Sequence, residues 1–291
     1  MDYLPSWLAF SAPLVGLVAG VALAPVAQRY FTRGEDRVTE SSEDGAAEGD
    51  GERSFGSITA PIVGITTLVL SFTLVQTWMS YQQAVISAHA EAVAVDYQSD
   101  MARLIPNRAE SKAATAALVC YSRAIVGPEW AAMERDEDVT ADEVRVWTTQ
   151  IAAEIGRPET NTPGREAGRA TVRADQERQA ARSDRLLQGR PSIPFALLLL
   201  LVVAAALAVA SLALANLPRE RRAWHIGALV VVALLFSGLL LAITDLDSPY
   251  SGVLRLEPTD MARTAEDGAR EYAARFPGEP LPCDGQGRVI R

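Results

Sequence analysis

The sequence predicts an all-α, polytopic membrane protein with four transmembrane helices, arranged as two hairpins that flank a helical soluble domain. Apolar residues are concentrated in four blocks, and a helix needs about 20 apolar residues to cross a hydrocarbon core of roughly 30 Å. None of the blocks has Asp, Glu, Lys, Arg or His in its interior, and strand-like alternation is nearly absent elsewhere. The spans are predicted at residues 1–27, 57–80, 195–215 and 226–244.

The first span, apolar from Trp7 onward, is expected to be retained, because it lacks the basic segment that precedes a cleaved signal peptide. Its small residues recur at every fourth position, so one helix face allows close approach of another helix. These candidate packing residues are Ala12, Gly16, Gly20 and Ala24. Chance is the alternative, since Ala and Gly are common in this chain. Residues 28–56 follow as an acidic loop, poor in apolar residues, that we expect to be disordered.

The second span carries a stripe of hydroxyl side chains along one helix face, with an amide at its margin. The stripe consists of Thr59, Thr66, Thr73, Thr77 and Ser80, and the amide is Gln76. Hydroxyl groups in hydrocarbon can bond back to their own helix, bond to a neighbouring helix, or line a wet cavity. The stripe therefore predicts either helix packing or a pore-lining face.

Residues 81–191 are predicted to form the helical soluble domain. The second span should continue as a helix to about residue 105, because no Gly or Pro stops it before Pro106. Further helices are predicted over residues 109–126, 129–133, 140–155 and 165–188. The first of these is expected to end at Gly127-Pro128, where the proline can begin the next helix. The C-terminal tail, residues 245–291, is predicted to hold one helix over residues 260–275.

Charge near the spans predicts the orientation in the membrane. The loop between the third and fourth spans and the segment after the first span are rich in Arg, whereas the N-terminal tail has no Lys or Arg. The positive-inside rule then places both termini and the large domain outside the cytoplasm. Arginines just before the third span favour the opposite orientation. A composition with a single lysine and many arginines is typical of a GC-rich bacterial genome, so the expected location is a bacterial plasma membrane.

The two cysteines lie on the same side of the membrane in this topology. Cys120 is in the large domain and Cys283 is in the tail, so they form a candidate disulfide if that side is oxidising. Two free thiols are the alternative.

Motifs for chemistry are lacking. The sequence has no HExxH, CxxC, GxSxG or glycine-rich phosphate loop, so we expect no catalytic residues, no metal site, no cofactor and no enzyme activity. The net charge of −9 is concentrated in residues 34–53, and no basic patch with interleaved aromatic residues predicts nucleic-acid binding. The expected partners are the lipid bilayer and further copies of the chain.

Several short motifs occur in a fixed order between residues 57 and 258. They are Trp78-Met79-Ser80-Tyr81, Glu91-Ala92, Tyr121, Glu129-Trp130, Arg182-Ser183-Asp184-Arg185-Leu186 and Asp247-Ser248-Pro249-Tyr250-Ser251-Gly252. This order resembles the bestrophin-like domain family of bacterial membrane proteins. The resemblance implies an oligomeric protein, an anion channel with the second span near the central axis, and a large loop in the cytoplasm. Bestrophins proper follow their proline-containing turn with an acidic calcium clasp, which Ser251-Gly252-Val253-Leu254-Arg255 does not supply.

Two functions stay open at this point. One is a homo-oligomeric, bestrophin-like anion channel that conducts small anions between its second spans. The other is a non-conducting membrane scaffold or sensor that presents the helical domain to a partner.

Overall fold

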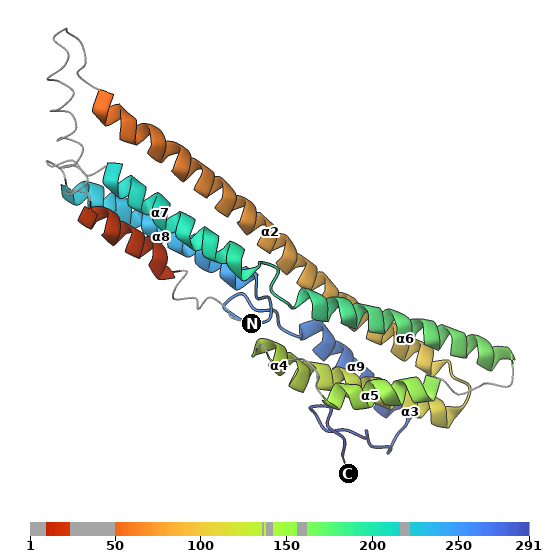
Figure 1. The fold of residues 1–291 in the computed structure, drawn as a ribbon. Coiled ribbons are helices and arrows are strands. Elements are labelled where there is room, and N and C mark those ends of the chain that lie inside the picture. The colour runs from red at the N-terminus through yellow and green to blue at the C-terminus, as the bar shows by residue number, and fades with distance from the viewer. Residues whose placement is uncertain are drawn as a thin grey trace, which may run out of the picture. The chain divides into compact units, whose positions relative to one another are not determined.

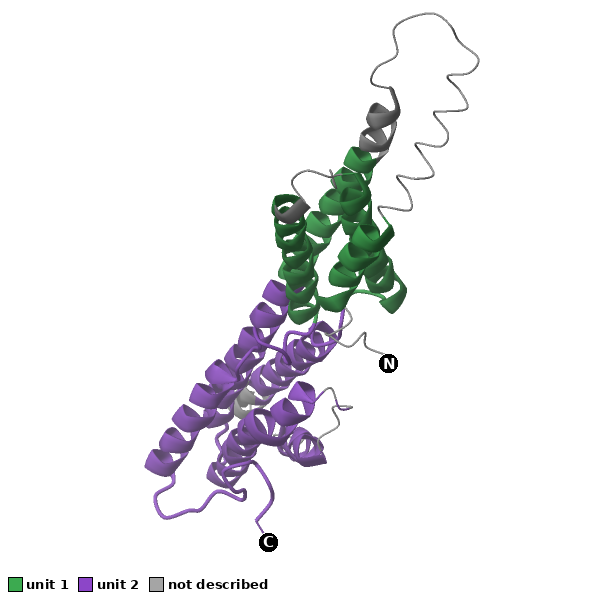
Figure 2. Ribbon diagram, turned by 90° about the vertical axis from the view of Figure 1, so that its left-hand side faces the viewer, with its two compact units in different colours: residues 1–78, 192–247 green, residues 79–191, 248–291 purple. Residues whose placement is uncertain are grey.

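The computed structural model describes residues 10–23, 50–135, 137, 142–155, 162–215 and 222–290. Over these residues the fold is all-α, with an isolated antiparallel β-bridge between Cys283 and Val289. The chain divides into two compact units (Figures 1 and 2). Unit 1 comes from Met1–Trp78 and Ser192–Asp247, and unit 2 comes from Met79–Pro191 and Ser248–Arg291. Each unit therefore joins segments that are far apart in the sequence.

Unit 1 is built from apolar helices. It contains the helix Phe10–Leu23, the first part of α2 (Asp50–Arg103), α7 (Phe195–Ala215) and α8 (Arg222–Leu246). Three described segments are long and apolar enough to cross a bilayer, namely Thr59–Arg103 within α2, the whole of α7, and Trp224–Leu246 within α8. The prediction of an all-α, polytopic membrane protein is confirmed.

The number of four spans stays a prediction. The helix Phe10–Leu23 is apolar but shorter than the other three. At 1.5 Å per residue it covers about 20 Å, which is less than a hydrocarbon core of about 30 Å. The remaining residues of the predicted first span, Ala24 among them, lie outside the described residues.

The core of unit 1 forms where these helices meet. Its fully buried side chains come from α2, α7 and α8, and include Leu70, Ala205, Val209, Leu240 and Ile243. Three of the six buried residues of α7 are alanine, and such small side chains let helix backbones approach closely where no hydrophobic effect drives association in lipid.

Unit 2 consists of the second part of α2 and the helices that share a core with it. Its other helices are α3 (Arg108–Ala124), η2 (Ile125–Glu129), α4 (Trp130–Glu134), α5 (Asp142–Ile155), α6 (Thr162–Gln188) and α9 (Thr259–Arg275). The helix α3 lies against α5 and α9 (Figure 1). Eleven of its residues are buried, which places α3 in the centre of the unit 2 core beside Trp147 and Ile151 of α5.

Two predicted boundaries were wrong. The acidic loop was expected to reach residue 56, but α2 already begins at Asp50; residues 28–49 lie outside the described residues. Extending a formed helix by one residue costs far less than starting a new one, so the span propagates backward through a segment that contains no proline.

The expected break at Gly127-Pro128 is also absent. Instead, η2 is a π-helical turn that contains Pro128 and connects α3 directly to α4. A π turn carries an extra residue in the helical ladder, which accommodates a proline that has no N–H to donate. As a result Glu129 and Trp130 continue the line of α3 and are both buried.

Candidate functional site

The four threonines of the predicted hydroxyl stripe are buried within unit 1. Thr59, Thr66, Thr73 and Thr77 are between 0% and 9% exposed. The Thr73 hydroxyl donates to the Val69 carbonyl at 2.9 Å, and the Thr77 hydroxyl lies 3.1 Å from the Thr73 carbonyl. These two threonines therefore bond back to their own helix, which was one of the three interpretations of the stripe.

A side chain buried inside its own protomer cannot face a pore between protomers. The structure therefore does not support a pore-lining role for the four threonines. Gln76 is exposed and Ser80 is half-buried, so these two stay candidates. The exposed face of the span is apolar instead, with Ile65, Leu68 and Phe72 between 65% and 72% exposed.

The small residues of the first helix face α7. A Cβ atom built on Gly16 would lie 2.9 Å from the Ala206 Cα, and one built on Gly20 would lie 2.7 Å from the Ala210 carbonyl oxygen. Ala12 is partly buried against the same core. The same helix is also bonded to α8, because the Ser237 hydroxyl of α8 donates to the Phe10 carbonyl at 2.9 Å.

Unit 2 contains a buried ion-pair network centred on Arg185 of α6. Arg185 is 1% exposed and pairs with Glu91 of α2 and Glu129 of η2, whose side chains are fully buried. The Arg185 guanidinium also lies 5.5 Å from the ring centroid of Trp130. Burial alone lowers the pKa of Arg185, but the two carboxylates outweigh it and the pKa is raised. The guanidinium is charged and ties three helices together.

Each carboxylate of the network has a second partner. The Tyr121 hydroxyl donates to Glu91 Oε1 at 2.6 Å, and Arg182 Nη2 donates to Glu129 Oε2 at 2.6 Å. Burial, followed by the charge of Glu91, raises the pKa of Tyr121, so its hydroxyl keeps its proton and stays a donor. A buried carboxylate is stable only when its oxygens are bonded in this way.

The network continues along α6 by one more turn. Arg178 is fully buried; it donates to Gln98 Oε1 at 2.8 Å and to Asp175 Oδ1 at 2.7 Å. Its guanidinium stacks 4.5 Å from the ring centroid of Tyr121. The three arginines are thus matched by three acidic partners, and the network is electrically balanced.

The segment after α8 closes over this network. Tyr250 is 2% exposed, and its ring packs edge-on against Trp130 with centroids 5.1 Å apart. The indole N–H of Trp130 donates to the Leu256 carbonyl at 3.2 Å. Gly252 has a φ of 92°, which glycine adopts without strain and which turns the chain back so that the Leu256 N–H reaches the Pro249 carbonyl at 2.8 Å.

Beside the network lies a cavity of about 220 Å³. Glu91, Arg185 and Trp130 line it together with the segment that leads into α9. His89 Nδ1 and Asp260 Oδ2, 2.9 Å apart, also contribute to its lining. Its charged lining groups on α2 and α6 are already paired with each other. Within the cavity lining, Glu91 and Arg185 therefore serve as structural partners that hold α2 and α6 together.

Asp247, which follows α8 in unit 1, organises the start of α7. Its Oδ1 atom accepts from the Ser192 N–H at 2.9 Å, the Ser192 hydroxyl at 2.7 Å and the Ile193 N–H at 3.2 Å. Burial raises the pKa of Asp247, although these hydrogen bonds oppose the shift. The carboxylate therefore fixes the backbone of Ser192 and Ile193, the residues that lead into α7.

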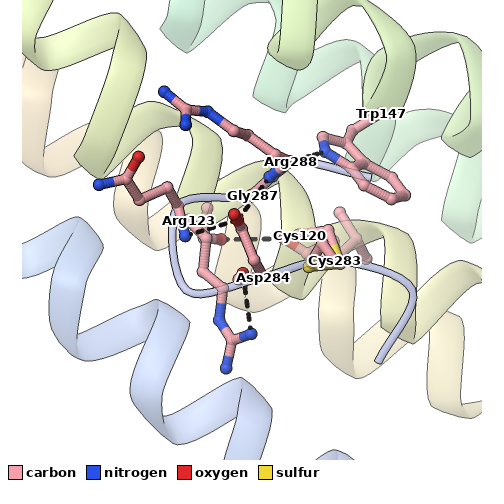
Figure 3. The surroundings of a disulfide bond; sticks show 10 residues. Cys120, Arg123, Trp147, Cys283, Asp284, Gly287 and Arg288 are labelled. Atoms are coloured by element: carbon pink, nitrogen blue, oxygen red, sulfur yellow. Dashed lines mark hydrogen bonds between the residues drawn. A yellow bond between two sulfur atoms is a disulfide. The ribbon is translucent and has the colours of Figure 1, made fainter. Parts of the chain in front are cut away.

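The tail is fixed to the unit 2 core by a disulfide. Cys120 of α3 and Cys283 of the tail are bonded, and both are buried. The tail then forms a tight loop in which the Asp284 N–H donates to the Arg288 carbonyl at 2.9 Å (Figure 3). The indole N–H of Trp147 donates to the Gly287 carbonyl. A Cβ atom on Gly287 would lie 2.6 Å from the Cys120 carbonyl oxygen, so only glycine allows this close approach.

Sequence reasoning missed the ion-pair network as a site. Glu91 and Arg185 are 94 residues apart, and no local pattern pairs them. A signal was present, because Arg178, Arg182 and Arg185 recur at helical spacing on one face of α6. The two carboxylates that pair with Arg185 also belong to the motifs whose order suggested the family.

Comparison with known proteins agrees with that resemblance. The Bestrophin-like domain family matches residues 35–261 of this chain. No curated protein sequence matches it. Among solved structures, a bacterial Bestrophin homolog from Klebsiella pneumoniae is similar in fold, with 14% identity, a TM-score of 0.65, and coverage of 91% of this chain and 98% of that one.

A second crystal structure gives the same result. A variant of the bacterial Bestrophin homolog from Klebsiella pneumoniae has 14% identity and a TM-score of 0.60, and the match covers 94% of this chain and 99% of that one. At such low identity these structures show the fold. The family match extends over most of the sequence, and the chain therefore belongs to the Bestrophin-like domain family.

Proposed function

We propose that this membrane protein is a homo-oligomeric anion channel in which the exposed face of α2 from each copy lines the pore. Membership of the Bestrophin-like domain family and the fold of the bacterial Bestrophin homolog support a channel. The observation that carries the proposal is the incomplete burial of α2. In an apolar stretch of 18 residues within its span, 17% of the residues are buried, against 33% in the corresponding stretches of α7 and α8.

The exposed face of α2 has the chemistry of a hydrophobic constriction. From Thr59 to Ser80 the span contains no ionisable side chain. Ions would pass rings formed by Ile65, Leu68 and Phe72, where dewetting opposes conduction, and then the amide of Gln76. The Gln76 amide offers two N–H donors, which can bind an anion, and one carbonyl acceptor.

Halide flux from liposomes that contain the purified oligomer tests this proposal. Phe72→Ser should increase the flux, because it replaces an exposed apolar ring with a wettable side chain. Thr73→Val is the matched control, since the adjacent residue lies on the buried face, and it should leave flux and selectivity unchanged. If a correctly assembled oligomer carries no flux at several voltages and pH values, the channel is refuted. A scaffold or sensor that presents unit 2 to a partner would then replace it.

We further propose that unit 2 and both termini lie outside the cytoplasm, opposite to the orientation that the family resemblance implies. The disulfide between Cys120 and Cys283 supports this, because such bonds persist in oxidising compartments. The basic loop between the third and fourth spans supports it independently. In spheroplasts, a membrane-impermeant maleimide should label Ser183→Cys, an exposed position on α6. Labelling only after membrane disruption would contradict the orientation.

A further inference from the structure

The segment between α8 and α9 forms a closed loop in unit 2. The Leu256 N–H donates to the Pro249 carbonyl at 2.8 Å, which brings the two ends of the loop together. Tyr250 and Leu256 at these ends are buried in the unit 2 core, whereas residues 252–255 are exposed. The base of the loop is therefore fixed, and its tip lies at the protein surface.

The tip of the loop exposes apolar side chains. Val253 is 89% exposed, more than any other large apolar side chain among the described residues, and Leu254 is 51% exposed. The end of α6 lies beside the base of the loop, because a Cβ atom on Gly189 would be 3.0 Å from the Tyr250 ring. Leu187, two residues earlier, is 60% exposed. Exposed apolar side chains that gather in this way mark a contact with another protein or with a membrane.

The loop begins close to the boundary of the hydrocarbon core. The 21 residues of α7 extend about 32 Å, so the whole helix is needed to cross a core of about 30 Å. Asp247, directly after α8, accepts a hydrogen bond from the Ser192 N–H at 2.9 Å, so the end of α8 lies beside the segment that leads into α7. Pro249 follows Leu246, the last residue of α8, by three positions, which span at most about 11 Å. The base of the loop therefore lies in or next to the headgroup layer, which is roughly 5–8 Å thick.

The charges of unit 2 beside these two spans suit an anionic surface. Arg190 is the sole charged residue in residues 187–191, and Arg255 is the sole charged residue in residues 248–256. Both arginines are exposed. Glu257 follows only after the buried Leu256. Arginine beside exposed aliphatic side chains is typical of the membrane interface, where the apolar groups enter the bilayer and the guanidinium stays among the phosphates.

We propose that the loop tip and the end of α6 form a membrane-contact surface for anionic phospholipids. Val253 and Leu254 enter the edge of the bilayer, and Arg190 and Arg255 bind lipid phosphate groups. A stable protein interface buries about 800 Å² on each partner, far more than two aliphatic side chains supply. The same side chains are sufficient for a lipid contact, because the adjoining spans already hold the loop at the bilayer. The contact goes beyond the proposed function and requires neither conduction nor the proposed orientation.

Fluorescence quenching in nanodiscs tests this surface in the full-length protein. Val253→Cys is labelled with bimane, and the native cysteines stay unlabelled because they are bonded to each other and buried. A phospholipid that carries a nitroxide near its headgroup should quench this label strongly, and iodide in the buffer should quench it weakly. Leu104→Cys is the matched control, because Leu104 is 60% exposed and lies about 39 Å beyond Trp78 along the axis of α2. It should show the opposite pattern.

The other outcomes overturn the proposal. Quenching of labelled Val253→Cys by iodide and not by the nitroxide lipid would place the loop tip in water. Quenching by neither agent would show that protein, such as a second copy of this chain, covers the tip. Both readouts are independent of halide flux, so a protein without flux refutes only the channel.

Two nitroxide lipids separate the contribution of the arginines. At equal mole fraction, nitroxide-labelled phosphatidylglycerol should quench Val253→Cys about two- to fivefold more strongly than nitroxide-labelled phosphatidylcholine. Arg190→Gln with Arg255→Gln should bring this ratio close to one. Arg263→Gln with Arg270→Gln is the control, because it removes the same charge from exposed positions on α9 and should keep the ratio. An equal ratio in the two double variants would refute the phosphate contact.

Discussion

Replacement of Arg185 by methionine should destabilise unit 2 strongly at neutral pH. Arg185 is 1% exposed and pairs with two carboxylates that have no exposed surface. Methionine fills a similar volume but donates nothing, so Glu91 keeps only Tyr121 and Glu129 keeps only Arg182. Removing one partner of a buried ion pair costs about 3–5 kcal/mol, because the remaining charge is uncompensated.

The loss should be visible in thermal unfolding of the full-length protein in detergent. For a unit of this size about 4 kcal/mol corresponds to a decrease in Tm of roughly 10 °C. The fluorescence of Trp130 reports on the transition, because its ring lies against Arg185 and Tyr250. Arg185→Lys is the conservative control, because it keeps the charge but cannot hold both carboxylates with a planar guanidinium. Its Tm should lie between that of the unsubstituted protein and that of Arg185→Met.

A compensating variant makes the reasoning refutable. If the cost comes from unpaired buried charge, then Glu91→Gln and Glu129→Gln introduced together with Arg185→Met should recover a large part of the lost Tm. An additive further decrease would show that the ion pairs are not the origin of the effect. If Arg185→Met alone lowers the free energy of unfolding by less than about 1 kcal/mol, the network contributes no more than an exposed ion pair does, and the reasoning is refuted.

Three other perturbations follow from the contacts described above. Gly16→Ala should lower stability in detergent by about 1–3 kcal/mol, because its Cβ would meet the α7 backbone. Gly238→Ala is the control and should be neutral, because its Cβ would have no atom within 4 Å. Equal effects of the two substitutions on stability would contradict this packing. Cys120→Ser with Cys283→Ser opens a bond between residues 163 positions apart. This should cost about 2–5 kcal/mol in denaturant unfolding, and reductant should then have no further effect; thiol-specific mass spectrometry that finds both cysteines free in the native protein would refute the bridge. Burial raises the pKa of Tyr250 from 10.0 to about 12. The part of the unfolding free energy that depends on the protonated tyrosine is present below pH 10 and should be lost as pH rises toward 12. Tyr250→Phe should reduce this alkaline loss, and an unchanged pH profile of stability would contradict it.

The positions of the three long apolar helices in the sequence were predictable, because length and composition decide which segments enter a bilayer. The bounds of α7 match the predicted span. The hydroxyl stripe of α2 was recognised as one helix face, but periodicity does not tell which partner a face meets. Four threonines of the stripe pack inside the protomer, and the exposed face bears Ile65 and Phe72 instead.

The ion-pair network could not be derived from local pattern. Glu91 lies on a helix that continues a membrane span, and its partner Arg185 is 94 residues away. Pairing of distant charges depends on the packing of α2, η2 and α6, which no spacing rule provides. The π turn at Pro128 was missed for a related reason, since Gly-Pro usually ends a helix and only the surrounding core keeps this one continuous.

Thiol modification of the open channel tests the central claim, that the exposed face of α2 lines an anion pore. Gln76 and Thr77 are adjacent, but Gln76 is exposed and Thr77 is fully buried. In liposomes, a charged methanethiosulfonate should change halide flux through Gln76→Cys and leave flux through Thr77→Cys unaltered. Modification of Thr77→Cys with no effect on Gln76→Cys would show that the pore lies on the opposite face of the helix and contradict the account.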